Sequence, residues 1–169
     1  MLVNKSFYCL KSYKEFQKML YRKVKILSYI TSFILVIVGV VLMFFEMPGY
    51  IYIVFGVALP IFINFFIRAM ENENIKKSAL LRCGAYQTFI FNEESVDIHQ
   101  ESKLGVFNDA YFYNEFISVY KNKEYYFFFV TRAQAFIVEV NGFVSGNDKE
   151  LDELLIKVMG KRFINKGHK

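Results

Sequence analysis

Residues 26–67 decide the fold. They read ILSYITSFILVIVGVVLMFFEMPGYIYIVFGVALPIFINFFI, and Glu46 is their one charged residue. Because a helix rises about 1.5 Å per residue, residues 26–45 can cross a hydrocarbon layer of roughly 30 Å, and residues 51–67 nearly can. Pro48 cannot continue a helix, and Gly49 supplies a free backbone dihedral. The stretch therefore predicts two transmembrane helices, 26–45 and 51–67, joined by a turn at 46–50.

Two other interpretations of this stretch are less favourable. A pair of buried core helices would need more surrounding chain than 169 residues provide. A cleavable signal peptide is disfavoured because twenty-five residues precede the apolar segment and no small-x-small cleavage pattern follows it.

Basic residues set the expected orientation. The turn carries no Lys or Arg, whereas both outer ends of the apolar stretch are basic. These expected membrane-interface residues are Lys18, Arg22, Lys23 and Lys25 before the first span, and Arg68, Lys76, Lys77 and Arg82 after the second. Since cytoplasmic flanks are enriched in positive charge, we expect both termini in the cytoplasm and the turn outside. The lipid bilayer is then the first expected partner.

The net charge of +5 does not indicate nucleic-acid binding, because it is unevenly distributed. Residues 1–25 carry seven basic groups and one acidic group, while residues 84–169 carry ten basic and twelve acidic groups. The positive charge flanks the membrane segment and does not mark a folded basic domain. We therefore expect no nucleic acid as a partner.

The segments that flank the spans have patterns of their own. Residues 5–10 can form a short strand, and Ser12 with Glu15 three residues later predicts the start of an amphipathic basic helix within residues 1–25. This helix can continue into the first span. It either lies on anionic lipid or packs on the cytoplasmic domain, and the strand ahead of it favours packing. Residues 68–83 read as a juxtamembrane helical linker.

Residues 84–169 alternate in polarity and predict a β domain. Six strand-like runs cover 85–91, 95–101, 104–110, 115–121, 124–130 and 134–140. A hairpin turn is expected at Asn122-Lys123, and a helix capped by Asn147 with Glu150 is expected to follow Gly146. The expected fold class is membrane α+β: a two-helix transmembrane hairpin plus a small antiparallel β half-barrel capped by a C-terminal helix.

Residues 111–140, YFYNEFISVYKNKEYYFFFVTRAQAFIVEV, resemble the YcxB-like family of bacterial membrane proteins. The shared pattern is an aromatic residue, a hydrophobic position four or five residues on, a short polar hairpin, an aromatic strand and an aliphatic strand before a terminal helix. The resemblance implies a pleckstrin-homology-like (PH-like) cytoplasmic domain and a location in the bacterial cytoplasmic (inner) membrane. Val140-Asn141-Gly142-Phe143 departs from the family's pattern, in which a Pro and a basic residue often follow the last strand. The family has no established activity, so the resemblance implies no catalytic residues.

Catalytic, cofactor and metal patterns are not found in the sequence. Cys9 and Cys83 are both expected on the reducing side, and His99 and His168 are too few for a usual metal site. The Gly-rich stretch at 141–148 lacks the Lys and the spacing of a phosphate loop. We therefore expect no enzyme, no cofactor and no metal.

Two functional hypotheses remain open. The first is a membrane-tethered binding or regulatory module that docks a protein partner or a second copy. Its possible partner surface is the aromatic strand Tyr125, Tyr126, Phe127, Phe128 and Phe129, whose two faces are both apolar. Burial of those faces beneath the terminal helix and the N-terminal segment is the simpler explanation of the same pattern. The second hypothesis is a protective, immunity-type membrane subunit in which the hairpin spans are the working part.

Overall fold

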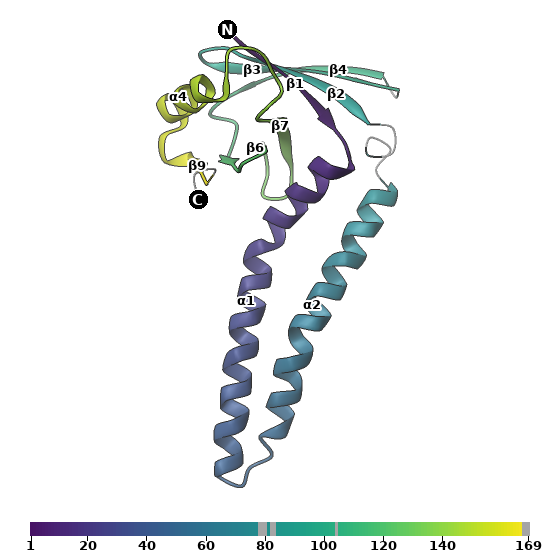
Figure 1. The fold of residues 1–169 in the computed structure, drawn as a ribbon, viewed down its shortest axis with the longest axis vertical. Helices are drawn as coiled ribbons and strands as arrows, with labels where there is room; N and C mark the ends of the chain where they lie inside the picture. The colour runs from purple at the N-terminus through teal and green to yellow at the C-terminus, as the bar shows by residue number, and fades with distance from the viewer. Residues whose placement is uncertain (78–80, 82–83, 104, 167–169) are drawn as a thin grey trace. The chain divides into compact units, whose positions relative to one another are not determined.

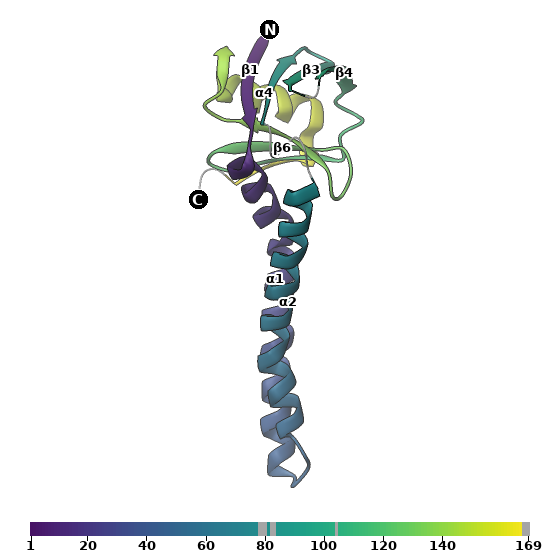
Figure 2. The ribbon, with the colours of Figure 1, turned by 90° about the vertical axis from the view of Figure 1, so that its right-hand side faces the viewer.

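The structure is a computed structural model that describes residues 1–77, 81, 84–103 and 105–166. It consists of long helices and short strands (Figures 1 and 2). In chain order the elements are β1 (Leu2–Tyr8), α1 (Leu10–Phe44), α2 (Tyr50–Lys77), β2 (Ala85–Phe91), β3 (Ser95–Ser102), β4 (Gly105–Phe112), β5 (Ser118–Lys121), β6 (Tyr125–Phe129), β7 (Ala135–Glu139), β8 (Phe143–Ser145), α4 (Asp148–Met159), the 3-10 turn η1 (Gly160–Arg162) and β9 (Phe163–Asn165).

The chain divides into two compact units, which are described separately. The β unit comprises Met1–Phe16 and Ser78–Lys169, and the helical unit comprises Gln17–Lys77. The boundary between the units falls within α1, after Phe16, so the first turns of α1 belong to the β unit. The linker at 68–83 is helical as far as Lys77, and Arg82 and Cys83 lie outside the described residues.

The helical unit consists of two helices that are long and apolar enough to cross a membrane. α1 is 35 residues long and runs without a break from the basic segment into the apolar one, as expected. α2 is 28 residues long and contains Pro60. Most of the large apolar side chains on both helices are exposed, Phe33 and Phe62 among them.

The turn between α1 and α2 differs from the expectation for Gly49. Glu46 adopts the left-handed conformation with φ 57°. The Met47 amide donates to the Leu42 carbonyl at 3.1 Å, and the Glu46 amide donates to the Met43 carbonyl at 3.2 Å, which together form a Schellman cap. Gly49 is needed for a different reason. A Cβ there would lie 2.0 Å from the Gly39 carbonyl oxygen, so the two helices approach through their backbones.

Pro60 creates a polar contact between the two helices. Proline has no amide hydrogen, so the Gly56 carbonyl loses its partner within α2. The Ser32 hydroxyl of α1 donates a hydrogen bond to that carbonyl. Asn64 donates to the Pro60 carbonyl at 2.8 Å and, weakly, to the Tyr29 hydroxyl at 3.4 Å. Ser32 therefore links the two helices, and Asn64 forms bonds both within α2 and to Tyr29 of α1.

The β unit contains two sheets. The first has the strand order β4-β3-β2-β1-β8, and the second has the order β7-β6-β5-β9. β1 and β2 are antiparallel neighbours from Leu2↔Phe91 to Tyr8↔Ala85, although α1 and α2 separate them in the chain. The sheets and α4 enclose one hydrophobic core, to which Phe89, Phe128 and Leu151 belong. This agrees with the expected antiparallel sheets and C-terminal helix.

Side chains join the two sheets where β1 meets β7. The Asn4 amide donates to the Glu139 carbonyl at 2.8 Å, and the Glu139 amide hydrogen bonds to the Ser6 hydroxyl at 2.7 Å. The Ser6 hydroxyl in turn donates to the Asn4 side-chain oxygen at 2.6 Å. Both polar side chains are buried, so each needs a hydrogen-bond partner, and these bonds tie β1 to β7.

Most sequence-based element predictions agree with the structure within a few residues. β2 matches its prediction, and the Asn147 cap with Glu150 is confirmed. Two short strands were missed: β8, and β9, which pairs in parallel with β5. α1 begins earlier than predicted. Ser12 lies in its first turn and accepts a hydrogen bond from the Cys9 amide at 3.1 Å, so it is not the N-cap.

Candidate functional site

The aromatic strand β6 does not form the expected partner surface. Tyr125, Tyr126, Phe127 and Phe128 are all buried, and Phe129 is half-buried. Tyr126 and Phe128 belong to the core with α4. On the other face, the Phe16 ring of α1 lies 6.0 Å from the Phe127 ring and 5.9 Å from the Phe129 ring. The simpler explanation weighed for this strand, burial on both faces, is the one that the structure supports.

The basic residues expected at the membrane interface are on the two long helices. Those with exposed side chains are Lys18, Arg22, Lys23, Arg68 and Lys76, and Lys25 is half-buried. Lys77 ends α2, and Arg82 lies outside the described residues. The exposed charges cluster at the ends of the apolar segments, which is the arrangement that phospholipid headgroups accommodate.

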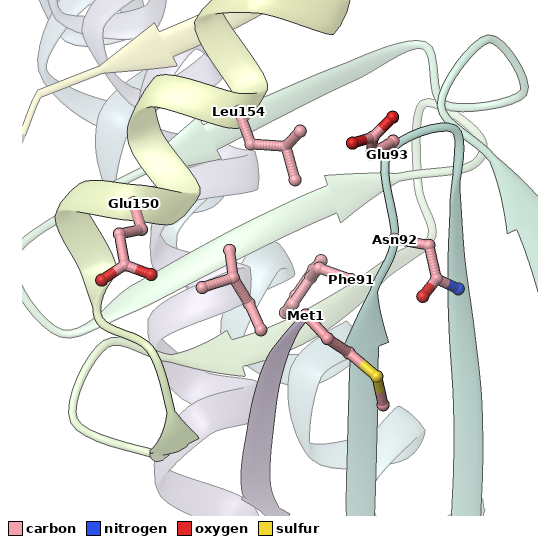
Figure 3. Close-up of a pocket in the computed structure, with 7 residues that line it drawn as sticks. Met1, Phe91, Asn92, Glu93, Glu150 and Leu154 are labelled. Atoms are coloured by element: carbon pink, nitrogen blue, oxygen red, sulfur yellow. The ribbon is translucent and has the colours of Figure 1, made fainter.

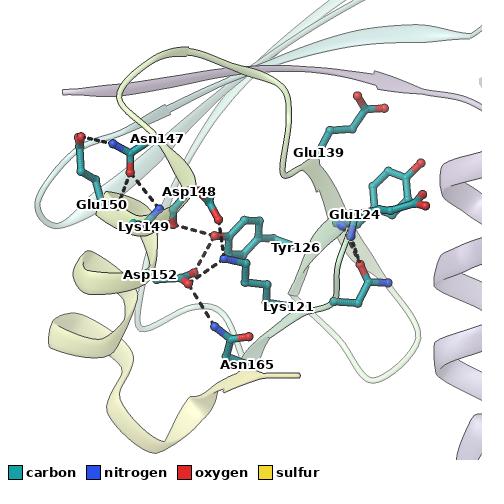
Figure 4. Close-up of polar contacts among 12 residues, drawn as sticks. Lys121, Glu124, Tyr126, Glu139, Asn147, Asp148, Lys149, Glu150, Asp152 and Asn165 are labelled. Atoms are coloured by element: carbon teal, nitrogen blue, oxygen red, sulfur yellow. Dashed lines mark hydrogen bonds and ion pairs between the residues drawn. The ribbon is translucent and has the colours of Figure 1, made fainter. Parts of the chain in front are cut away.

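A buried charged cluster joins α4 to the second sheet (Figure 4). Lys121 of β5 lies 3.0 Å from the Asp148 carboxylate and 2.7 Å from the Asp152 carboxylate. Its side chain is only 7% exposed. The Tyr126 hydroxyl donates to Asp152 at 2.6 Å, and Asn165 of β9 donates to the same residue at 3.1 Å. We call these five residues the clasp.

Local sequence explains how the clasp forms. Asp148 and Asp152 are four residues apart, so they lie on the same face of α4. Asn147 caps that helix by accepting hydrogen bonds from the Lys149 and Glu150 amides. Burial, followed by the hydrogen bond to Asp152, raises the pKa of Tyr126 well above its usual value. Tyr126 therefore stays protonated at neutral pH and acts as a hydrogen-bond donor that anchors the helix.

A second polar cluster lies where β1 leads into α1. A cavity of about 300 Å³ is lined by Cys9, Lys11, Glu124, Tyr125, Glu139 and Asn141. Lys11 and Glu124 form an ion pair at 3.0 Å, but their side chains are 71% and 56% exposed, so the pair contributes little to stability. Burial raises the pKa of Glu139, and Glu124 raises it further, whereas Lys11 and the Phe7 amide lower it.

A larger cavity of about 450 Å³ opens beside α4 (Figure 3). Its lining includes the apolar side chains of Leu2, Phe91 and Leu154 and the acidic residues Glu93 and Glu150. Glu150 already accepts a hydrogen bond from Asn147 at 2.6 Å. Among the residues that the structure describes, no group of three His, Cys, Asp or Glu side chains could hold a metal ion.

The edge strand β4 is exposed, which the sequence did not predict. Every residue of β4 is exposed except Tyr111, which is half-buried, and β4 pairs only with β3. Val106 is 70% exposed and Phe112 is 58% exposed. The alternating pattern predicted a strand here but could not tell an edge strand from a covered one, because both alternate in the same way.

Comparison with known proteins gives one match. No curated protein and no solved structure matches the chain. The matched segment runs from the end of β3, through the aromatic strand and its hairpin, to the middle of α4. Residues 102–155 match the model of the family described as YcxB-like protein, so the resemblance found in the sequence is confirmed for this part of the chain.

Proposed function

We propose that this chain is an integral protein of the bacterial cytoplasmic membrane, with two spans and both termini in the cytoplasm, and that it works as a membrane-tethered, non-catalytic binding module. The observation that carries the proposal is the pairing of β1 with β2. Tyr8 and Ala85 are paired residues, so the chain leaves the β unit before α1 and returns to it after α2. Two paired strands must lie on the same side of a bilayer. The chain between β1 and β2 must therefore cross the bilayer an even number of times, and two spans meet this condition.

Charge distribution supports the same orientation. The turn between the helices carries Glu46 and no Lys or Arg, whereas the opposite helix ends are basic. Positive flanks are retained in the cytoplasm, which would place the β unit there. The two sheets, which are antiparallel except for the β5–β9 pair, and the C-terminal helix that shares their core support a PH-like fold for that unit.

The polar residues within the two helices favour a tethering role for the hairpin over the immunity-type alternative. Ser32 and Asn64 form hydrogen bonds to groups within the helical unit, and Pro60 accounts for the carbonyl that Ser32 contacts. Ionisable residues inside a span would indicate transport or gating, but the stretch 26–67 has only Glu46, in its turn. The exposed surface of the β unit is therefore the better candidate for the working part.

Topology is the first test. A reporter inserted at Gly49 and a reporter fused after Lys169 should indicate opposite sides of the membrane. A cytoplasmic signal from the Gly49 insertion would refute the two-span arrangement.

Photo-crosslinking in cells tests the binding role. A photoreactive amino acid placed at exposed positions of the β unit, Val106, Val144 and Ile156, should form protein adducts. The same amino acid at Phe33 or Phe62 should form mainly lipid adducts. Protein adducts at the helix positions alone would favour the immunity-type alternative, in which the spans do the work.

A further inference from the structure

The edge strand β4 is the one long strand of the first sheet with an open side. It lies at the end of the order β4-β3-β2-β1-β8 and pairs with β3 along its whole length, from Ser95↔Phe112 to Ser102↔Gly105. An exposed strand of this length offers backbone donors and acceptors to any extended chain that approaches it. What could pair with β4 depends on which of those backbone groups are free and on the charge around them.

Hydrogen bonds of β4 show which amides face outward. The Tyr113 amide donates to the Glu94 carbonyl at the β3 side. The alternate amides of Phe112 and Ala110 bond to carboxylates instead, Phe112 to Glu115 at 2.7 Å and Ala110 to Asp109 at 2.9 Å. Because amide direction alternates along a strand, the Asn108 and Val106 amides also face away from β3.

The outer edge of β4 therefore has two halves. From Asp109 to Phe112, acidic side chains occupy the outward amides and block strand pairing, a common protection of edge strands. From Gly105 to Asn108, the outward amides of Val106 and Asn108 have no such carboxylate among the described residues. Val106 is 70% exposed there and Phe107 is 47% exposed, so this half also presents apolar side chains. We call residues 105–108 the open segment.

The residues around the open segment are mostly acidic, and this charge determines which kind of partner segment is favoured. Residues 92–115 contain six acidic groups and one basic group, Lys103. The acidic residues are Glu93, Glu94, Asp97, Glu101, Asp109 and Glu115. A second copy that paired through its own β4 would bring two such acidic hairpins together, and that repulsion is unfavourable. A basic segment has the complementary charge.

The geometry points to the open segment, Gly105–Asn108, as a docking edge for an extended segment of a partner protein that alternates basic and apolar side chains. The partner strand bonds to the Val106 and Asn108 backbone. Val106 and Phe107 point to opposite faces of the sheet, so the apolar side chains of the partner contact Phe107 on one face, and its basic side chains lie near Glu101, which is opposite Val106 on the other face. This inference rests on the proposed binding role and names its surface. The partner would bind by adding a strand to the sheet edge, and neither of the two cavities takes part.

The test uses the full chain in a neutral detergent and a labelled peptide, Lys-Val-Thr-Val-Lys-Val-Thr-Val-Lys. We expect saturable binding that weakens with salt, together with slower hydrogen exchange of the Val106 and Asn108 amides. The same peptide N-methylated at every residue from the second to the eighth keeps its charge but has no amide hydrogen on either edge, and it should bind about tenfold more weakly. Equal binding of the methylated peptide would overturn the inference, because it would indicate charge attraction alone.

Matched variants locate the site. Val106→Lys should weaken peptide binding about tenfold, because it adds a repelling charge beside the open segment. Val144→Lys is the control, since Val144 is 66% exposed on β8 at the opposite edge of the same sheet, and binding should be unchanged. Both valines are exposed, so neither substitution should unfold the protein. Equal effects of the two variants, or no binding by any of the peptides, would overturn the inference.

The two proposals fail in different ways. Photo-crosslinks from Val144 or Ile156 with none from Val106 would leave the binding role in place and refute the docking edge. A topology reporter that contradicts the two-span arrangement would refute the membrane-tethered role, whereas the peptide experiment would still decide whether residues 105–108 accept a strand.

Discussion

The helical unit and the β unit satisfy the hydrogen-bonding needs of their polar groups in different ways. In the helical unit, neutral groups pair one to one: the Ser32 hydroxyl satisfies the Gly56 carbonyl, and glycines let the helix backbones approach. In the β unit, the clasp gathers one cation and two carboxylates around the Tyr126 hydroxyl. A one-to-one pair can be lost at small cost, whereas a charged cluster requires all its members, because removal of one leaves the others buried and unpaired.

The largest expected effect comes from the clasp. Lys121→Met keeps the length of the side chain but removes the cation between Asp148 and Asp152, and the free energy of unfolding of the β unit should fall by about 3 kcal/mol. Urea denaturation of the full chain in detergent, followed by tyrosine fluorescence, measures this change. The control is Lys123→Met in the exposed β5–β6 turn, for which we expect a change within about 0.5 kcal/mol. A similar loss in both variants would mean that the clasp contributes no more than a surface charge.

Gly49→Ala tests the close approach in the hairpin. The new Cβ would lie 2.0 Å from the Gly39 carbonyl oxygen, and backbone atoms cannot move aside as a flexible side chain can. We expect a loss of about 2 kcal/mol, measured as a lower midpoint in thermal denaturation of the helical circular dichroism signal. Val57→Ala, on an exposed part of α2, should leave the midpoint nearly unchanged. An unaltered midpoint for Gly49→Ala would show that the helices do not pack through these glycines.

Ser32→Ala has a smaller expected effect, about 0.6 kcal/mol, because hydrogen bonds between membrane helices are worth little on average. A double-mutant cycle with Pro60→Ala sharpens the test. Alanine at position 60 restores an amide hydrogen that can bond to Gly56 within α2, so Ser32→Ala should cost less in the Pro60→Ala background. Equal costs in both backgrounds would mean that Ser32 does not compensate for Pro60.

The smallest expected effect is the pH dependence at Glu139. Burial raises the pKa of Glu139 above its ordinary value of 4.5, so the folded state binds a proton more readily than the unfolded state does. The contribution of Glu139 to stability is therefore fully present below pH 4.5 and is lost as the pH rises through the raised pKa. Glu139→Gln should flatten the stability profile in that range, measured by urea denaturation at several pH values. An unchanged slope for Glu139→Gln would contradict the assignment.

Patterns that are local in sequence predicted most of the fold. The apolar length predicted α1 and α2, and alternation predicted β2 through β7, because burial of one face imposes a period of two. Contacts between residues that are far apart in the sequence could not be predicted in this way. β9 is three residues long and pairs with β5 through a parallel contact, and the clasp brings Lys121 to Asp148 and Asp152 from distant segments. Neither has a signal within a short window of sequence.

The same limit affected the candidate surfaces. Composition alone favoured Tyr125–Phe129 as a partner surface, but Phe16 and α4 cover this strand on its two faces. Exposure of β4 depends on the strand order of the sheet, which alternation does not encode. The turn at Glu46 is a related case. Residue type alone favoured Gly49 for the unusual backbone dihedral of the turn, but the left-handed residue is Glu46, where the hydrogen bonds of the Schellman cap require it.

The insertion of both long helices between β1 and β2 has a consequence for biosynthesis. β1 leaves the ribosome first, but its partner strand begins only at Ala85, after the whole hairpin has been translated. At 5–20 residues per second, the nascent β1 waits on the order of ten seconds with its backbone unpaired. Translation of the whole hairpin therefore precedes completion of the first sheet. A ribosome pause between α2 and β2 would lengthen the interval in which β1 is open to proteolysis or to pairing with another nascent chain.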